Sequence, residues 1–255
     1  MKSFAAAALV GLFFGVAVIY MVHTDAATSV QEKPIKKYVG PIVDYDQEFQ
    51  TAVVADPKER ELRAARGRRY NKKAPQPLAE LPPNWVGYDT GTDWYIGLIG
   101  LPVDQSDAVI TGEVVASEAH ISPDKTGVYS EFSIRVDQLL KNHLDSGLKL
   151  GEVTVGEREG GVVRLQGDRL FEYTVYNQGM PRVGQRYLFF LSRNKEGEDY
   201  SIVTGYELRQ GEAVPLDDIK ASAIFKGTDE QELLNKVREQ THRPARPAKE
   251  RKEKK

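Results

Sequence analysis

The residues best suited to chemistry in this sequence lie near the end of one predicted strand. Glu118 and His120 are two positions apart and would share a strand face, and Asp124 follows in the next turn. A carboxylate beside an imidazole can act as an acid/base pair or bind a metal ion. One histidine without supporting ligands seldom makes such a site, and a polar hairpin end explains the same residues. An enzyme with a site near His120 is therefore kept as an alternative.

A second group of charges, Glu157 and Glu159 on either side of Arg158, precedes Gly160-Gly161. On a strand the two glutamates would share a face, as glycosidase carboxylates do, but the solubility of an edge strand explains them equally well. The chain has no cysteine and four histidines, which excludes thiol nucleophiles and Cys-ligated metals. It also lacks a G-x-S-x-G elbow and a Gly-rich phosphate loop before a helix. We assign no catalytic, cofactor-binding or metal-ligating residue, and the balance favours a protein that is not an enzyme.

Both tryptophans lie in the stretch "NWVGYDTGTDWYIGLIG", residues 84–100. Trp85 and Trp94, with Tyr88 and Tyr95, would make stacking platforms for sugars or an extended peptide if they were exposed. If they were buried, they would form a strap that seals one mouth of a barrel. Large aromatic side chains are more often buried than exposed, so the buried strap is favoured.

The chain opens with an apolar run. Phe4 to Val22 is nineteen residues without a charge, preceded by Lys2. As a helix it would be roughly 28 Å long, close to the hydrocarbon core of a bilayer and longer than the apolar region of a signal peptide. We predict a signal anchor over residues 1–27 with its span at 4–22. The body would be exported on a single-pass anchor in the cell membrane. Cleavage near Ala26, which would release a soluble secreted β-domain, is the alternative.

Charge is distributed unevenly. Residues 57–73 carry a net +6 and residues 242–255 a net +5, whereas residues 74–241 carry −11. The basic arms could touch an anionic surface or an envelope polymer. Alternatively they are solvated and partly disordered, or they fold back on the acidic body, and this second group of explanations is favoured. The acidic body argues against nucleic acid as a partner.

The sequence divides into four parts. After the anchor, residues 28–83 read as a tether with a short basic helix and a proline-rich linker. That helix should begin at Asp56-Pro57, an N-cap followed by proline at the first helical position. Residues 84–241 form the body, and residues 242–255 are predicted to be a disordered tail.

The body reads as β-structure. "DAVITGEVVASEAHI" and "VYSEFSIRVDQLL" predict a hairpin in which Phe132, Ile134 and Val136 face inward. "SPDKTG" supplies the turn, with Gly127 able to tolerate a positive φ. Further short strands follow, and the apolar run from Tyr187 to Leu191 predicts a strand covered on both faces. The fold class is therefore mainly β, a small closed barrel or a sandwich.

A C-terminal helix should dock on the body. Thr228 and Gln231 have the spacing of a capping box, with Thr228 as the N-cap. Leu233, Leu234 and Val237 then form an apolar stripe.

The strands "DAVITGEVVASEAHISPDKTGVYSEFSIRVDQLLKN", "VTVGEREGGVVRL" and "GMPRVGQRYLFFLSR" resemble an uncharacterised family of exported bacterial β-domains. Their layout is also similar to the OB-like barrel of tissue inhibitors of metalloproteinases and netrin modules, without the cysteines. The resemblance covers about residues 106–216, and its motifs are structural. It implies a fold and an exported address, and no activity. Together these features predict a membrane-anchored, non-catalytic binding domain of the bacterial cell envelope, which could have a protein partner.

Overall fold

The computed structural model describes residues 41–46, 56–91, 93–142, 147–196 and 198–242. The predicted anchor at 1–27 and the basic tail from residue 243 onward lie outside these residues, and those predictions stay predictions. Within the described ranges, no helix is both long enough and apolar enough to cross a membrane.

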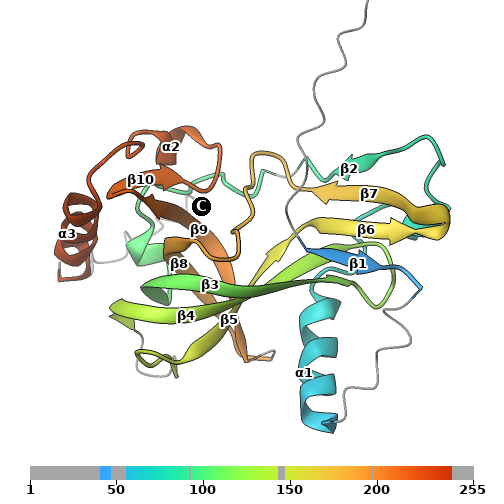
Figure 1. Cartoon of the computed structure of the whole chain (residues 1–255), viewed down its shortest axis with the longest axis horizontal. Helices are drawn as coiled ribbons and strands as arrows, with labels where there is room; N and C mark the ends of the chain where they lie inside the picture. Colours follow the sequence, from blue (N-terminus) through green and yellow to red (C-terminus); the bar gives the residue numbers. More distant parts are fainter. Residues whose placement is uncertain (1–40, 47–55, 92, 143–146, 197, 243–255) are drawn as a thin grey trace, which may run out of the picture. The chain divides into compact units, whose positions relative to one another are not determined.

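Five strands form a near-closed ring (Figure 1). They are β3 (Ala108–Ile121), β4 (Val128–Asn142), β5 (Val153–Glu159), β8 (Arg186–Asn194) and β9 (Asp199–Arg209). Their order around the ring is β3, β4, β5, β9, β8 and back to β3, and β10 (Glu212–Pro215) extends the sheet beside β9. The pairings are antiparallel except that of β5 with β9, which is parallel and joins two residue pairs. The prediction of a mainly β fold is confirmed.

A second sheet packs against the far ends of β3 and β4. Its strands, in spatial order, are β1 (Ile42–Asp44), β6 (Gly161–Leu165), β7 (Arg169–Thr174) and β2 (Gly87–Asp89). A β-bulge between Val114 and Ala116 shifts the register of β3, so one strand serves two cores. Before the bulge Ile110 and Val114 fill the ring, and after it Ala119 and Ile121 join the core under the second sheet.

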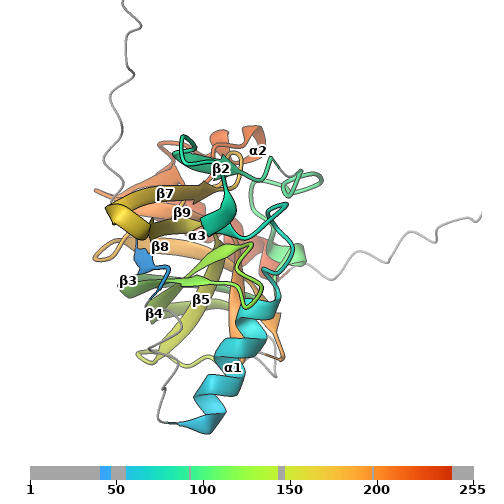
Figure 2. The ribbon, with the colours of Figure 1, turned by 90° about the vertical axis from the view of Figure 1, so that its right-hand side faces the viewer.

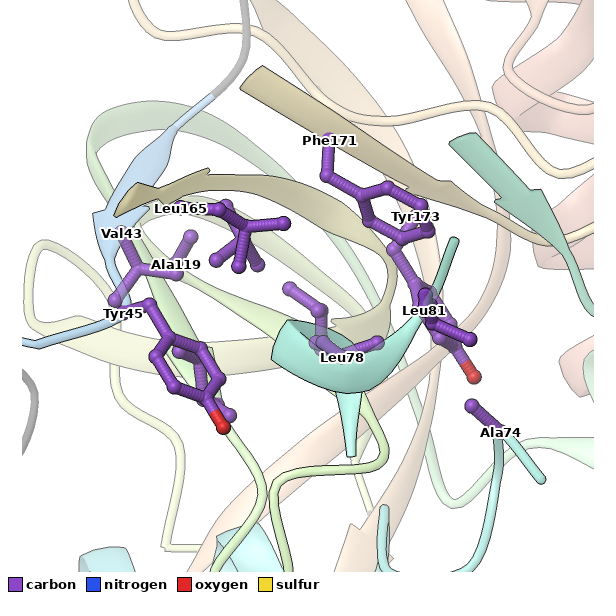
Figure 3. Close-up of a cluster of buried hydrophobic side chains, with 12 residues drawn as sticks. Val43, Tyr45, Ala74, Leu78, Leu81, Ala119, Leu165, Phe171 and Tyr173 are labelled. Carbon is purple, nitrogen blue, oxygen red and sulfur yellow. The ribbon is translucent and has the colours of Figure 1, made fainter. Parts of the chain in front are cut away.

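Residues 41–46 and 56–83, which the sequence assigned to the tether, pack on the body wherever the structure describes them. β1 pairs with β6, and Leu78 on the short helix η1 (Leu78–Glu80) is fully buried. Figure 3 shows Leu78 in the middle of a cluster that includes Tyr45, Leu81 and Tyr173. The body therefore starts well before residue 84. Prolines 75, 77, 82 and 83 bend the chain around buried leucines instead of spacing it away from the domain.

The hairpin prediction is confirmed. Phe132, Ile134 and Val136 are buried inside the ring. The positive φ falls on Lys125, at 63°, and not on Gly127. Gly127 is needed for a different reason, since a Cβ at this position would lie 2.1 Å from the backbone oxygen of Tyr70.

The apolar run of β8 is covered on both faces, as predicted. Tyr187, Phe189 and Leu191 point into the ring, while Leu188 and Phe190 belong to a third cluster on the outside of the sheet. That cluster also receives residues from η2 (Val103–Gln105) and from the C-terminal helix α3 (Glu230–Thr241). The two remaining short helices are η3 (Gln166–Asp168) and α2 (Lys220–Ala223).

Both longer helices begin with an aspartate cap. α1 (Pro57–Arg68) starts as predicted, with Asp56 accepting a hydrogen bond from Lys58 N at 2.9 Å. The prediction of Thr228 as the cap of α3 is wrong, because Asp229 accepts from Gln231 N and Glu232 N instead. The carbonyl of Thr228 binds Ala213 N at 2.8 Å, which ties this residue to β10.

Replacing Leu234 with alanine should destabilise the protein by about 2–4 kcal/mol, because the side chain is fully buried in the third cluster and its loss leaves a cavity. Gln240→Ala, at a more exposed position of the same helix, should change stability by less than about 0.5 kcal/mol. Urea unfolding of both variants checks this. Equal midpoints for the two would contradict the docking of α3.

Candidate functional site

Glu118 and His120 come together as expected, but they do not form an open site. His120 Nε2 lies 3.7 Å from a carboxylate oxygen of Glu118 and 3.7 Å from one of Glu131. The histidine is only 3% exposed and packs beside the Tyr129 ring at 5.1 Å. Arg66 approaches Glu131 at 3.4 Å, and Arg63 approaches Glu118 at 3.8 Å, so both carboxylates already have cationic partners. The cluster leaves little access for a substrate.

Asp124 belongs to a different network. Its carboxylate accepts hydrogen bonds from Ser122 Oγ and Thr126 Oγ1, both at 2.8 Å, and from the backbone N of Lys72 at 2.6 Å. Partial burial opposes ionisation, but these hydrogen bonds outweigh it and lower the pKa of Asp124 below its usual range. The aspartate fastens residues 71–73 to the hairpin turn. Across the described ranges, no three His, Asp or Glu side chains are arranged as ligands for one metal ion.

Glu157 is part of a buried ion cluster under α1. Arg69, just after the helix, bridges Glu157 and Asp199 with contacts of 2.5 Å to each, and both carboxylate side chains are fully buried. Ser201 and Asn194 donate further hydrogen bonds to Glu157, at 2.9 and 3.0 Å. In both views α1 lies beside the ring strands that carry these carboxylates (Figures 1 and 2). The basic arm at 57–73 thus folds back on the acidic body.

Two carboxylates so close together in a buried place do not both ionise freely. Burial raises the pKa of Glu157 to about 7, and the charge of Asp199 adds to the effect while Arg69 opposes it. Burial also raises the pKa of Asp199, although the positive charges of Arg69 and Arg66 act to lower it. The Glu157–Asp199 pair therefore takes up a proton more readily than two exposed carboxylates would, and Arg69 lies against both side chains. The arrangement suits the attachment of a helix better than the cleavage of a substrate.

Arg158 points to the opposite side of β5. Its guanidinium donates two hydrogen bonds to Asp217, at 2.7 and 2.8 Å, and both side chains are almost completely buried. The Trp94 ring lies over the same guanidinium, 5.5 Å from its centre. Sequence reasoning missed this pair, although an arginine inside an otherwise β-forming run was a signal that it needed a buried partner.

The aromatic segment is only partly the buried strap that the sequence favoured. It is fixed by hydrogen bonds from Trp94 Nε1 to Tyr176 O at 2.8 Å and from Tyr206 OH to Gly100 O at 2.5 Å. Leu101 and Val103, at its end, are buried in the third cluster. Trp85, however, is 39% exposed, and Trp94 and Tyr95 are half-buried.

Large apolar side chains along this segment face solvent. Val86 is 81% exposed, Ile96 73% and Ile99 52%. Three more exposed apolar residues belong to its neighbours: Leu170 and Tyr176 in and after β7, and Ile224 beside the Phe225 that lies against Gly100. We call this set the apolar surface: Trp85, Val86, Ile96, Ile99, Leu170, Tyr176 and Ile224. Single exposed apolar residues are ordinary on protein surfaces, whereas several of them on one segment and its direct neighbours favour a binding surface.

Replacing Arg69 with glutamine should destabilise the protein by about 2–4 kcal/mol, because Glu157 and Asp199 would lose the cation that they share. Arg68→Gln, at the exposed neighbouring position, should cost less than about 0.5 kcal/mol. Chemical unfolding measures both. Similar losses for the two variants would contradict a specific role for Arg69.

Glu157→Gln should change how stability depends on pH. Between the ordinary glutamate pKa of about 4.3 and the native value near 7, native Glu157 keeps a proton that the unfolded chain has released. Its contribution to the free energy of unfolding is complete below that window and declines as pH rises through it. The stability of Glu157→Gln relative to the parent should therefore increase from pH 5 to pH 8, by on the order of 1 kcal/mol or more. A constant difference across that range would refute the assignment.

Comparison with family models and with curated proteins finds no match to this chain.

Proposed function

We propose that this chain is a membrane-anchored, exported, non-catalytic binding domain of the bacterial cell envelope, and that it holds a protein partner on the apolar surface. The observation that carries the proposal is the exposure of Val86 and Ile96, at 81% and 73%, on a backbone that hydrogen bonds hold in place. Exposed apolar side chains that gather on one surface mark protein–protein interaction sites, so we take these residues as the contact area for a partner.

The chemistry of the surface favours protein over carbohydrate. It combines aliphatic side chains with one tryptophan and one tyrosine, which is the composition of the centre of a protein interface. Sugar sites need polar groups around a flat ring, whereas within the apolar surface only Trp85 and Tyr176 carry a polar side-chain atom. A protein partner therefore fits better than a polymer.

The fold supports a binding role. A five-stranded ring in the order β3, β4, β5, β9, β8 has the strand order of an OB-like barrel, a scaffold that binds ligands through its faces and loops. Here α1 covers the outer side of β4 and β5 with Arg66 and Arg69. Since that face is occupied, the apolar surface is the better candidate for a partner.

The proposed location in the membrane rests on the sequence. The uncharged run Phe4–Val22 is long enough for a single membrane span, and the acidic body behind it would be exported. Carbonate-resistant membrane association at full-length mass is the expected result of fractionation and mass spectrometry. A soluble species trimmed near Ala26 would instead make this a secreted β-domain.

The enzyme alternative near His120 has less support. His120 is 3% exposed, its carboxylate neighbours are paired with arginines, and Asp124 is used elsewhere. An active site needs access for its substrate, which this cluster does not offer.

Cells expressing the full chain with a photo-crosslinking residue at position 96 should yield one dominant adduct, because Ile96 would lie in the interface. With the purified partner, Ile96→Ser or Val86→Ser should weaken binding about tenfold, as loss of a central apolar contact does. Val183→Ser is the matched control, since Val183 is also 51% exposed but lies outside the apolar surface. Adducts of equal yield at positions 96 and 183, or equal affinity of all variants, would refute the proposal.

A further inference from the structure

The second sheet ends in a strand whose outer edge is unpaired among the described residues. β2 is the last strand in the order β1, β6, β7, β2, and the described residues pair with it only through β7. In Figure 1 it is likewise the outermost strand of that sheet. Residues 85–91 and 169–175, which form this edge, are all described. A strand in this position presents backbone N–H and C=O groups with which another strand can pair.

The hydrogen bonds to β7 show which residues of β2 direct their backbone groups outward. β7 donates to the carbonyl of Val86 and accepts from the N–H of Thr90, each at 3.1 Å. Successive residues of a strand direct their backbone groups to opposite edges, so Tyr88 also faces β7, whereas Gly87 and Asp89 face away from it. Gly87 is half-buried and Asp89 is exposed. Over the part of the chain that the structure describes, no strand pairs with these two residues on their outer side.

The two faces of this edge differ in chemistry. Strand alternation places Val86, which is 81% exposed, on the same face as the half-buried ring of Tyr88. The other face carries Asp89 and, on β7 directly opposite Gly87, Glu172, and both carboxylates are exposed. Because Gly87 has no side chain, nothing on β2 separates Glu172 from a strand beyond it, two strand spacings or about 10 Å away. An added strand would therefore meet an apolar face and an acidic face.

The two carboxylates are not neutralised by their neighbours. Within the described ranges, neither Asp89 nor Glu172 takes part in an ion pair, and Asp89 accepts a hydrogen bond from Gly91 N at 3.0 Å. Arg169, at the start of β7, directs its guanidinium to backbone carbonyls ahead of β2. Pairing with a second copy would bring the same carboxylates together, which like charges oppose. The charge favours a different partner, with basic side chains on this face.

We propose that the protein partner contributes an extended segment that pairs with the outer edge of β2. The segment hydrogen-bonds to the backbone of Gly87 and Asp89. Its apolar side chains cover Val86 and Tyr88, and its lysines or arginines lie over the acidic face. The recognised sequence thus alternates apolar and basic residues. This inference rests on the proposed function, because β2 begins directly after two residues of the apolar surface, and it adds the form of the partner.

The test titrates a fluorescent heptapeptide, in which four lysines alternate with three valines, with the full chain in nanodiscs of neutral phosphatidylcholine. Fluorescence anisotropy reports binding, and empty nanodiscs are the blank. One matched peptide has glutamate in place of each lysine. The other keeps the lysines but is N-methylated at every residue, so that its backbone donates no hydrogen bond. The lysine peptide should bind at least about tenfold more tightly than either one. Equal binding of the N-methylated peptide would overturn the proposal, because attraction to the acidic body would then be sufficient.

Variants assign the binding to β2. Asp89→Ala removes the charge and keeps the backbone N–H, whereas Asp89→Pro removes both. The two should melt at about the same temperature, because that N–H faces away from β7 and an edge strand tolerates proline there. Asp89→Ala should weaken the lysine peptide about threefold and Asp89→Pro about tenfold or more. Glu61→Gln, at an exposed position of α1, is the charge control and should bind like the parent.

Equal affinity of Asp89→Ala and Asp89→Pro for the lysine peptide would contradict pairing with β2. Should the proline variant melt lower, the N-methylated peptide decides the question on the unaltered chain.

Failure of this inference and failure of the proposed function have different readouts. Peptide binding that does not depend on backbone N–H groups, with a dominant adduct retained at position 96, would refute the strand pairing alone. Peptide binding that depends on them, without a dominant adduct at position 96, would support the pairing at β2 and refute the partner on the apolar surface.

Discussion

The contact of Arg69 with Glu157 and Asp199 joins the basic segment that contains α1 to the acidic β-body. One guanidinium serves two fully buried carboxylates, one from β5 and one from the start of β9. These strands meet in the ring through only two parallel residue pairs, so the arginine bridges the weakest seam of the barrel from outside. The attachment of α1 and the closure of the ring are therefore stabilised by the same charge.

The long strands β3 and β4 make a second kind of link. Each contributes to the core of the ring and to the core under the second sheet, and the bulge after Val114 lets β3 change the face that it buries. Close packing on both sides leaves little freedom at the hairpin turn, where Tyr70 lies against Gly127 and stacks on Tyr129 at 4.6 Å. Segments on both sides of the molecule are thus positioned by a single hairpin.

Features set by neighbouring residues could be predicted from the sequence. The alternation in Val128–Asp137, the aspartate cap of α1 and the stripe Leu233, Leu234 and Val237 depend on local spacing, and the structure has them. The prediction of the α3 cap was wrong because Thr228 and Asp229 are both good N-cap residues. The carbonyl of Thr228 accepts a hydrogen bond from β10, and Asp229 caps the helix. The docking of residues 70–81 could not be predicted, since Leu78 finds partners in strands more than forty residues away.

The candidate sites were harder to predict for the same reason. Glu157 was visible as a charge on a strand, but its role depends on Arg69, 88 residues earlier. The composition of residues 84–100 could not tell which rings the fold would cover, and Trp94 is half-covered because Arg158 and Tyr176 lie beneath it.

The separation of Arg69 from Asp199 also bears on the order of events during synthesis. The two residues are 130 positions apart, and a ribosome adding about 5–20 residues per second needs roughly 6 to 26 s to span them. Until β9 is made, Arg69 lacks Asp199 and the edge of β5 lacks its parallel partner. Such a chain acquires its non-local contacts late and together, and it is most exposed to misassembly just before β9 is complete. The first helix of the body to be synthesised, α1, is therefore among the last elements to gain its full set of contacts.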